Sequence, residues 1–128
     1  MSLLKPTPGQ VIDRLTILEL KIEAYRAAKR PVNALLDEGS QLRRHISKFK
    51  AHTTALLEMV RGLEIVNREL WAAEDKVRAL PPEDLTNLAH TAREIARLND
   101  ARMFLVHELD KAFDWKEPVE EKVYTNQG

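Results

Sequence analysis

The chain has 128 residues, of which 44% are hydrophobic and only 5% are aromatic, and its 20 Lys and Arg residues balance its 20 Asp and Glu residues. At this length one domain can bury about two-thirds of its surface without disulfides or a structural metal. The sequence has no cysteine, which excludes a disulfide scaffold, a cysteine zinc site and thiol catalysis. The zero net charge argues against a nucleic-acid binder, and no apolar run has the length of a signal peptide or a membrane span. We therefore expect a cytoplasmic protein that binds neither nucleic acid nor membrane.

The spacing of apolar residues predicts an all-α protein. Only four glycines occur, and no alternating apolar and polar run lies between hairpin turn signals. The first helix is predicted over about 8–29. Thr7 as N-cap, Pro8 at the first helical position and Gln10 form a capping box at its start, and Pro31 requires it to stop.

Three further helices are predicted, over about 33–50, 53–79 and 83–113. Polar residues at 50–54 favour a break between the second and third, while an unbroken three-four spacing of apolar residues across the same stretch leaves one long helix as the alternative. The predicted fold is an elongated bundle of three to four antiparallel helices, with one domain over 1–113 and an irregular tail over 114–128. The apolar face predicted for the last helix comprises Leu88, Ala92, Ile95, Met103 and Val106.

The length of the last two helices predicts a dimer. They would extend about 40 and 45 Å, whereas a compact domain of this size has a radius of gyration of about 14 Å. One copy then has too little interior to cover the apolar faces of such long helices. A coiled-coil-like homodimer that buries at least about 1,000 Å² is the expected solution, and another protein is the alternative partner.

Helical wheels place polar residues on faces predicted to be buried. Asp13 falls within an apolar stripe of the first helix, and Asn67 and Glu74 lie in that of the third. Asn99 lies on the inner face of the fourth helix, with Arg102 at its margin. Since an unpaired buried polar group costs about 1–3 kcal/mol, these groups should pair or bind a ligand. The candidate residues of this ligand-binding or structural network are Asp13, Asn67, Trp71, Glu74, Arg78, Arg93, Asn99, Asp100 and Arg102.

The usual catalytic and metal motifs do not occur. The four histidines have no metal-ligand spacing, and the sequence contains no glycine-rich phosphate loop and no nucleophile elbow. Residues 26–50 carry seven Lys and Arg residues against two carboxylates, which we interpret as solvated helix faces because aromatic stacking residues are nearly absent there. We expect no metal and no cofactor.

Two sequence elements resemble a known family. Residues 8–21 read Pro-Gly-Gln-Val-Ile-Asp-Arg-Leu-Thr-Ile-Leu-Glu-Leu-Lys, and residues 99–102 contain an Asn-Asp-x-Arg element. With Asn67, Trp71 and the ending Glu120-Glu121-Lys122, they make the chain similar to a family of small bacterial helical proteins, a domain-of-unknown-function family. Val123 departs from the hydroxyl or small residue that this pattern favours. The resemblance implies a helical fold and the same polar positions, and it supplies no reaction.

Two functions fit these observations. The first is a non-catalytic helical interaction module, in which inward polar residues specify the packing. The second is a small-molecule binding protein or enzyme with its site inside the bundle, for an anionic or sugar-phosphate-like ligand. There Arg78, Arg93 or Arg102 would hold the anion, the two asparagines would orient it, and Glu74 or Asp13 would handle a proton. A fully paired dry network favours the first, and a solvent-reachable cavity favours the second.

Overall fold

The computed structural model describes residues 5–51, 54–113 and 115. These residues form four helices and no strand: α1 (Pro8–Ala27), α2 (Asn33–Ile46), α3 (Leu56–Ala79) and α4 (Leu85–Ala112). The predicted all-α fold is confirmed, with helix ends within a few residues of those expected. Most of the predicted tail, 114–128, lies outside the described residues.

The start of α1 follows from its cap. The Thr7 N–H donates to Gln10 Oε1 at 2.9 Å, and the Gln10 N–H donates to Thr7 Oγ1 at 3.2 Å, which together form the predicted capping box. At the other end, Lys29 has a φ of 57°, a left-handed conformation that ends the helix ahead of Pro31.

The predicted break between the second and third helices is confirmed, and the alternative of one continuous helix is wrong. The Ser47 N–H and the Phe49 N–H close a turn on Arg43 and Ile46, so the chain leaves the axis of α2. Ile46 and Phe49 still pack against the same apolar cluster as Leu56. The continuous three-four spacing therefore arose because both segments face one core.

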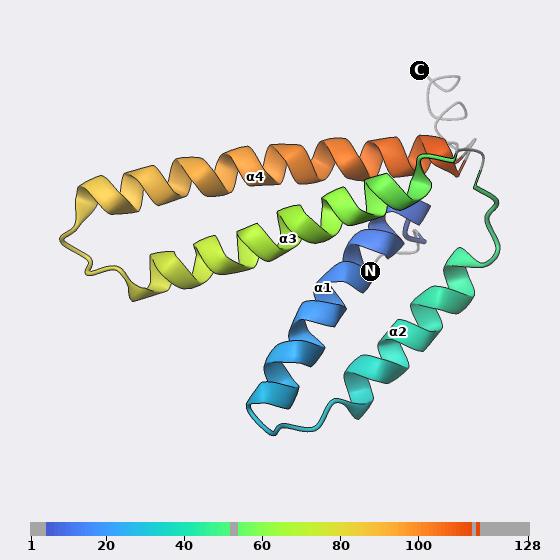
Figure 1. Ribbon diagram of the computed structural model, residues 1–128, viewed down its shortest axis with the longest axis horizontal. Coiled ribbons are helices and arrows are strands. Elements are labelled where there is room, and N and C mark those ends of the chain that lie inside the picture. Colours follow the sequence, from blue (N-terminus) through green and yellow to red (C-terminus); the bar gives the residue numbers. More distant parts are fainter. Residues whose placement is uncertain (1–4, 52–53, 114, 116–128) are drawn as a thin grey trace, which may run out of the picture.

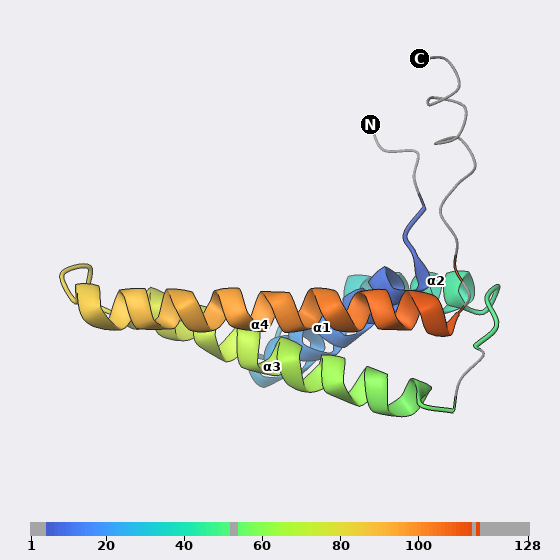
Figure 2. The ribbon, with the colours of Figure 1, turned by 90° about the horizontal axis from the view of Figure 1, so that it is seen from above.

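The four helices form two hairpins, α1–α2 and α3–α4, which meet at one end and diverge like the arms of a V (Figure 1). Seen edge-on, α1, α2 and α4 lie at a similar depth, and α3 slopes so that its start lies to one side of them (Figure 2). α1 packs against all three other helices, whereas α2 packs along α1. The elongation comes from α3 and α4, whose 24 and 28 residues extend about 36 and 42 Å.

Two apolar clusters hold this arrangement. One lies where the hairpins meet and combines Ile12 of α1, Leu63 of α3 and Leu109 of α4. The other lies along the α3–α4 seam around Leu70 and Leu98. Among the described residues, no helix combines the length and apolar character that a membrane span requires.

Candidate functional site

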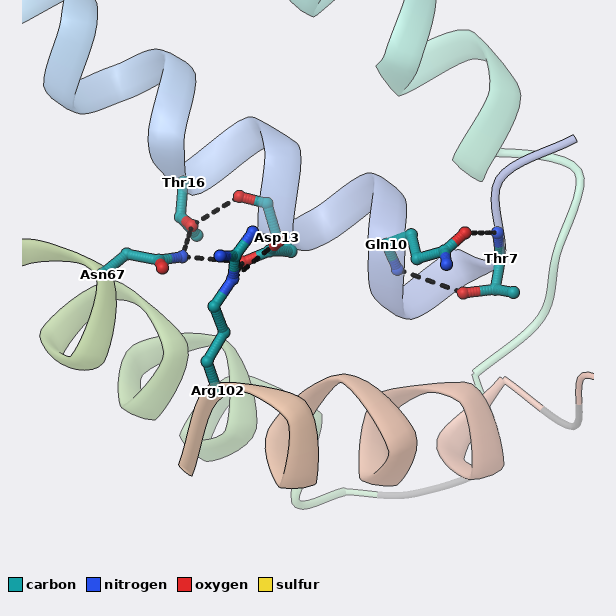
Figure 3. A network of polar contacts seen from close by, with 6 residues as sticks. All are labelled: Thr7, Gln10, Asp13, Thr16, Asn67 and Arg102. Carbon is teal, nitrogen blue, oxygen red and sulfur yellow. Dashed lines mark hydrogen bonds and ion pairs between the residues drawn. The ribbon is translucent and has the colours of Figure 1, made fainter. Parts of the chain in front are cut away.

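A network of polar side chains joins three helices just inside the point where the hairpins meet (Figure 3). Asp13 of α1 is 8% exposed and Asn67 of α3 is 4% exposed. Asn67 Nδ2 donates to Asp13 Oδ1 at 2.8 Å and to Thr16 Oγ1 at 2.7 Å. The Thr16 hydroxyl in turn donates to the Asp13 carbonyl at 2.7 Å. These contacts pair the polar groups that α1 and α3 bury against each other.

Arg102 of α4 completes the network with a two-pronged ion pair. Its Nε lies 3.0 Å from Asp13 Oδ1, and its Nη2 lies 2.5 Å from Asp13 Oδ2. This fork geometry matches the carboxylate and gives a charge-assisted pair. The hydrogen bond to Asp13 raises the pKa of Arg102 and outweighs the lowering by burial, and the charge of Glu74 acts in the same direction. Arg102 therefore stays cationic.

Contacts with α4 fix the position of the N-terminus of α1, and with it the position of Asp13 in this network. The Gly9 N–H donates to Asp110 Oδ1 at 2.7 Å, which places a carboxylate at the positive end of the α1 dipole. Gly9 also approaches α4 so closely that a Cβ there would lie 2.2 Å from the Val106 carbonyl oxygen. Glycine is thus required for α1 to bring Asp13 within reach of Arg102.

An open cleft of about 220 Å³ adjoins the network, between α1, α3 and α4. Its apolar lining comes from Ile17, Leu20 and Leu70. The remaining lining residues are polar or aromatic: Lys21, Asn67, Trp71, Glu74, Asn99 and Arg102. Trp71 forms one wall and is half-buried.

Several polar groups at this cleft have unused hydrogen-bonding capacity within the described residues. Asn67 turns its Nδ2 toward two acceptors, so its Oδ1 accepts no hydrogen bond there. The Nη1 of Arg102 likewise donates none, because the ion pair uses Nε and Nη2. Neither Lys21 nor Asn99 makes a hydrogen bond to the described part of the chain. The cleft therefore offers both donors and acceptors to a molecule from solution.

The structure brings together only part of the predicted set of polar residues. Asp13, Asn67 and Arg102 form the network, and Trp71 lines the cleft beside it. The predicted interior positions of Glu74 and Asn99 are wrong, because both side chains are exposed at the cleft. The wheel angles identified the correct face of each helix, but α1 diverges from α3 and α4 there and leaves an open cleft instead of covering that face (Figure 1).

The other predicted residues lie outside the network. Arg78 forms an exposed ion pair with Asp75, and Arg93 and Asp100 are exposed on α4. Ala92 and Met103 were also placed on the inner face of the last helix, but Ala92 is exposed and Met103 is 53% exposed. At the height of Met103, α1 packs against its neighbours Arg102 and Val106 and leaves Met103 uncovered.

Sequence reasoning missed two residues of this region. Thr16 joins the network through its hydroxyl, and its position one turn after Asp13 on the same stripe was a usable signal. Lys21 was not among the predicted site residues, yet it lines the cleft. Its role depends on where α3 and α4 cross α1, which the sequence does not encode locally.

A second depression, of about 430 Å³, lies between α1 and α3 and shares Trp71 with the cleft. Its charged groups are already paired: Glu23 binds Arg68, and Asp75 binds Arg78. It therefore offers less to a polar ligand than the smaller cleft. In the part of the chain that the structure describes, no group of three or more His, Asp or Glu side chains is placed to hold a metal ion.

The fold and the site define an all-α protein with a buried Asp-Arg-Asn network beside a small open cleft. Comparisons of the chain with protein-family models, with curated protein sequences and with solved structures give no match.

Proposed function

We propose that the chain is a non-catalytic helical interaction module that forms a homodimer through α4. The observation that carries the proposal is an exposed apolar stripe on that helix, which repeats at alternating intervals of four and three residues. Leu85 is 73% exposed and Met103 is 53% exposed at its two ends. This spacing is the one by which a helix presents a seam to another helix. The stripe consists of Leu85, Ala89, Ala92, Ala96 and Met103, and the polar Asn99 occupies the position of the repeat between Ala96 and Met103.

The half of the α3–α4 hairpin away from α1 supports the same proposal. In this half the described residues bury little more than the seam, with Ala73 on α3 and Thr91 on α4. Neither α1 nor α2 follows the hairpin to its tip (Figure 1). Most of the stability of helices in proteins comes from packing of an apolar face. Two long helices that pack only against each other are therefore stabilised further when another hairpin packs against them.

The charges beside the stripe favour a second copy as the partner. Arg93 and Asp100 lie two turns apart on one edge of α4, about 10 Å from each other, and neither forms an ion pair with a described residue. In an antiparallel two-fold pairing with Ala96 near the axis, Arg93 of each copy faces Asp100 of the other. The same register sets Met103 against the small side chain of Ala89. The edge is thus complementary to itself.

A charge-exchange experiment tests this register. Arg93→Glu and Asp100→Arg, each alone, place like charges opposite each other twice per dimer, so each should weaken self-association at least about tenfold. An equimolar mixture of the two variants pairs Glu with Arg and Arg with Asp, and it should form a heterodimer with near wild-type affinity. Sedimentation velocity over the micromolar range measures all three samples.

A matched pair of lysine substitutions supplies the control. Ala96→Lys places a charge at the proposed axis and should give a monomer, while Ala72→Lys, at an exposed mid-helix position of α3, should leave the dimer intact. A wild-type monomer throughout the concentration range would overturn the proposal. So would a mixture of the two charge variants that stays monomeric, or equal dissociation by both lysines.

A further inference from the structure

We infer that the cleft between α1, α3 and α4 binds a small zwitterion of the free α-amino-acid class. All of the groups that the inference uses come from one copy of the chain, and one of them, Asn99, also lies on the stripe proposed as the dimer seam.

The inference begins with the charges that remain once the internal pairs are formed. Arg102 forms an ion pair with Asp13. Lys21 and Glu74 also line the cleft and form no ion pair with a described residue. Beside the larger effect of a hydrogen bond in each case, however, the charge of Lys21 lowers the pKa of Glu38 and the charge of Glu74 raises the pKa of Arg102.

One charge of each sign suits a ligand that also carries one of each. A phosphate or dicarboxylate would bring two negative charges to a lining with one uncommitted cation, and it would meet the carboxylate of Glu74. A neutral polyol would leave both charges without a counterion. An α-amino acid carries an ammonium and a carboxylate on the same carbon, so its carboxylate can pair with Lys21 and its ammonium with Glu74 in a cavity of this size.

The other polar groups of the cleft also provide both donors for a carboxylate and an acceptor for an ammonium. The free Nη1 of Arg102 and the amide of Asn99 add donors for a carboxylate. Asn67 Oδ1 adds an acceptor for an ammonium. The orientation of this amide is fixed, since its Nδ2 must face the Asp13 carboxylate and cannot be exchanged for the oxygen.

The apolar part of the cleft accounts for the side chain of the ligand. Trp71 forms a wall, and Leu20 and Leu70 line the cleft with it. The volume of about 220 Å³ is below the range typical of drug-sized ligands, which limits the occupant to a small molecule. An amino acid with an aliphatic side chain of moderate size matches this lining.

Titration calorimetry of the full chain with each of the twenty L-α-amino acids, up to millimolar concentrations, tests the inference. At least one should bind. For the best binder, the matching amine without the carboxylate and the matching acid without the ammonium should each bind at least about tenfold more weakly, because each loses one ion pair. Inorganic phosphate, a sugar phosphate and a dicarboxylate are tested beside them.

Two substitutions test the site itself. Lys21→Met and Glu74→Gln should each weaken binding at least about tenfold, while Lys76→Met and Glu69→Gln, at exposed positions of α3 that do not line the cleft, should leave it unchanged. Melting curves and sedimentation verify that every variant keeps its fold and oligomeric state. The inference is overturned if no amino acid binds, if either single-charge analogue binds as well as the amino acid, if only a phosphate or dicarboxylate binds, or if the two cleft variants bind like wild type.

Discussion

The Asp13–Arg102 pair is asymmetric in its burial, and this asymmetry determines which residue is harder to replace. The Asp13 side chain is 11% exposed, whereas that of Arg102 is 32% exposed. If Asp13 is removed, the guanidinium can still reach water. If Arg102 is removed, a carboxylate remains buried with one amide donor, and an uncompensated buried charge is the costly outcome.

We therefore expect Arg102→Met to lower the free energy of unfolding by about 3 kcal/mol, and Asp13→Asn to lower it by about 1–2 kcal/mol. Met keeps much of the packing of the Arg stem. Urea unfolding at a fixed protein concentration measures both values. The double variant should regain part of the loss, because it leaves no unpaired charge. Equal costs for the two single variants would contradict this account.

At the level of the helices, the two glycines of α1 and α3 play opposite parts. A Cβ at Gly9 would clash with the backbone of α4 at 2.2 Å, whereas one at Gly62 would meet Leu105 at 3.6 Å, an ordinary contact. Gly9→Ala must move α1 away from α4 and with it Asp13 away from Arg102.

Gly9→Ala should therefore destabilise the protein by about 1–3 kcal/mol, while Gly62→Ala should stabilise it by about 0.5–1 kcal/mol through helix propensity. Thermal melts of the two variants beside wild type provide the test. A neutral Gly9→Ala would mean that α1 does not approach α4 this closely in solution.

The helices themselves could be predicted from the sequence because their signals are local. The Thr7–Gln10 box, Pro31 and the acidic start at Asp84 act within one turn of the residues that they cap. Asp13 and Asn67 were also predictable as buried, since their helices are covered at those heights. For Glu74 and Asn99 the wheel gives the correct face, but their burial depends on how closely α1 follows the hairpin. The direction of α1 is set by contacts across about 90 residues of sequence, such as that between Asp13 and Arg102.

For the whole molecule, the proposed homodimer makes stability depend on concentration. If the uncovered half of the hairpin is completed by a second copy, association stabilises the folded state by mass action. The melting midpoint of the wild type should rise as protein concentration is raised over the micromolar range. The Ala96→Lys variant should melt at one temperature throughout. A concentration-independent wild-type midpoint would show that the hairpin is stable alone.

The attachment of α2 mainly to α1 gives the molecule two levels of local stability. Gly39 is the one buried residue of α2, and the Arg14–Glu38 ion pair that ties it to α1 is substantially exposed, so its contribution is small. α2 can open while the other three helices stay packed, because the cluster and the polar network that join them use few of its side chains. Its amide hydrogens then exchange with solvent by local opening, whereas those near Asn67 and Leu109 exchange only through global unfolding. We therefore expect α2 to be the unit of lowest local stability, which opens while α1, α3 and α4 stay packed.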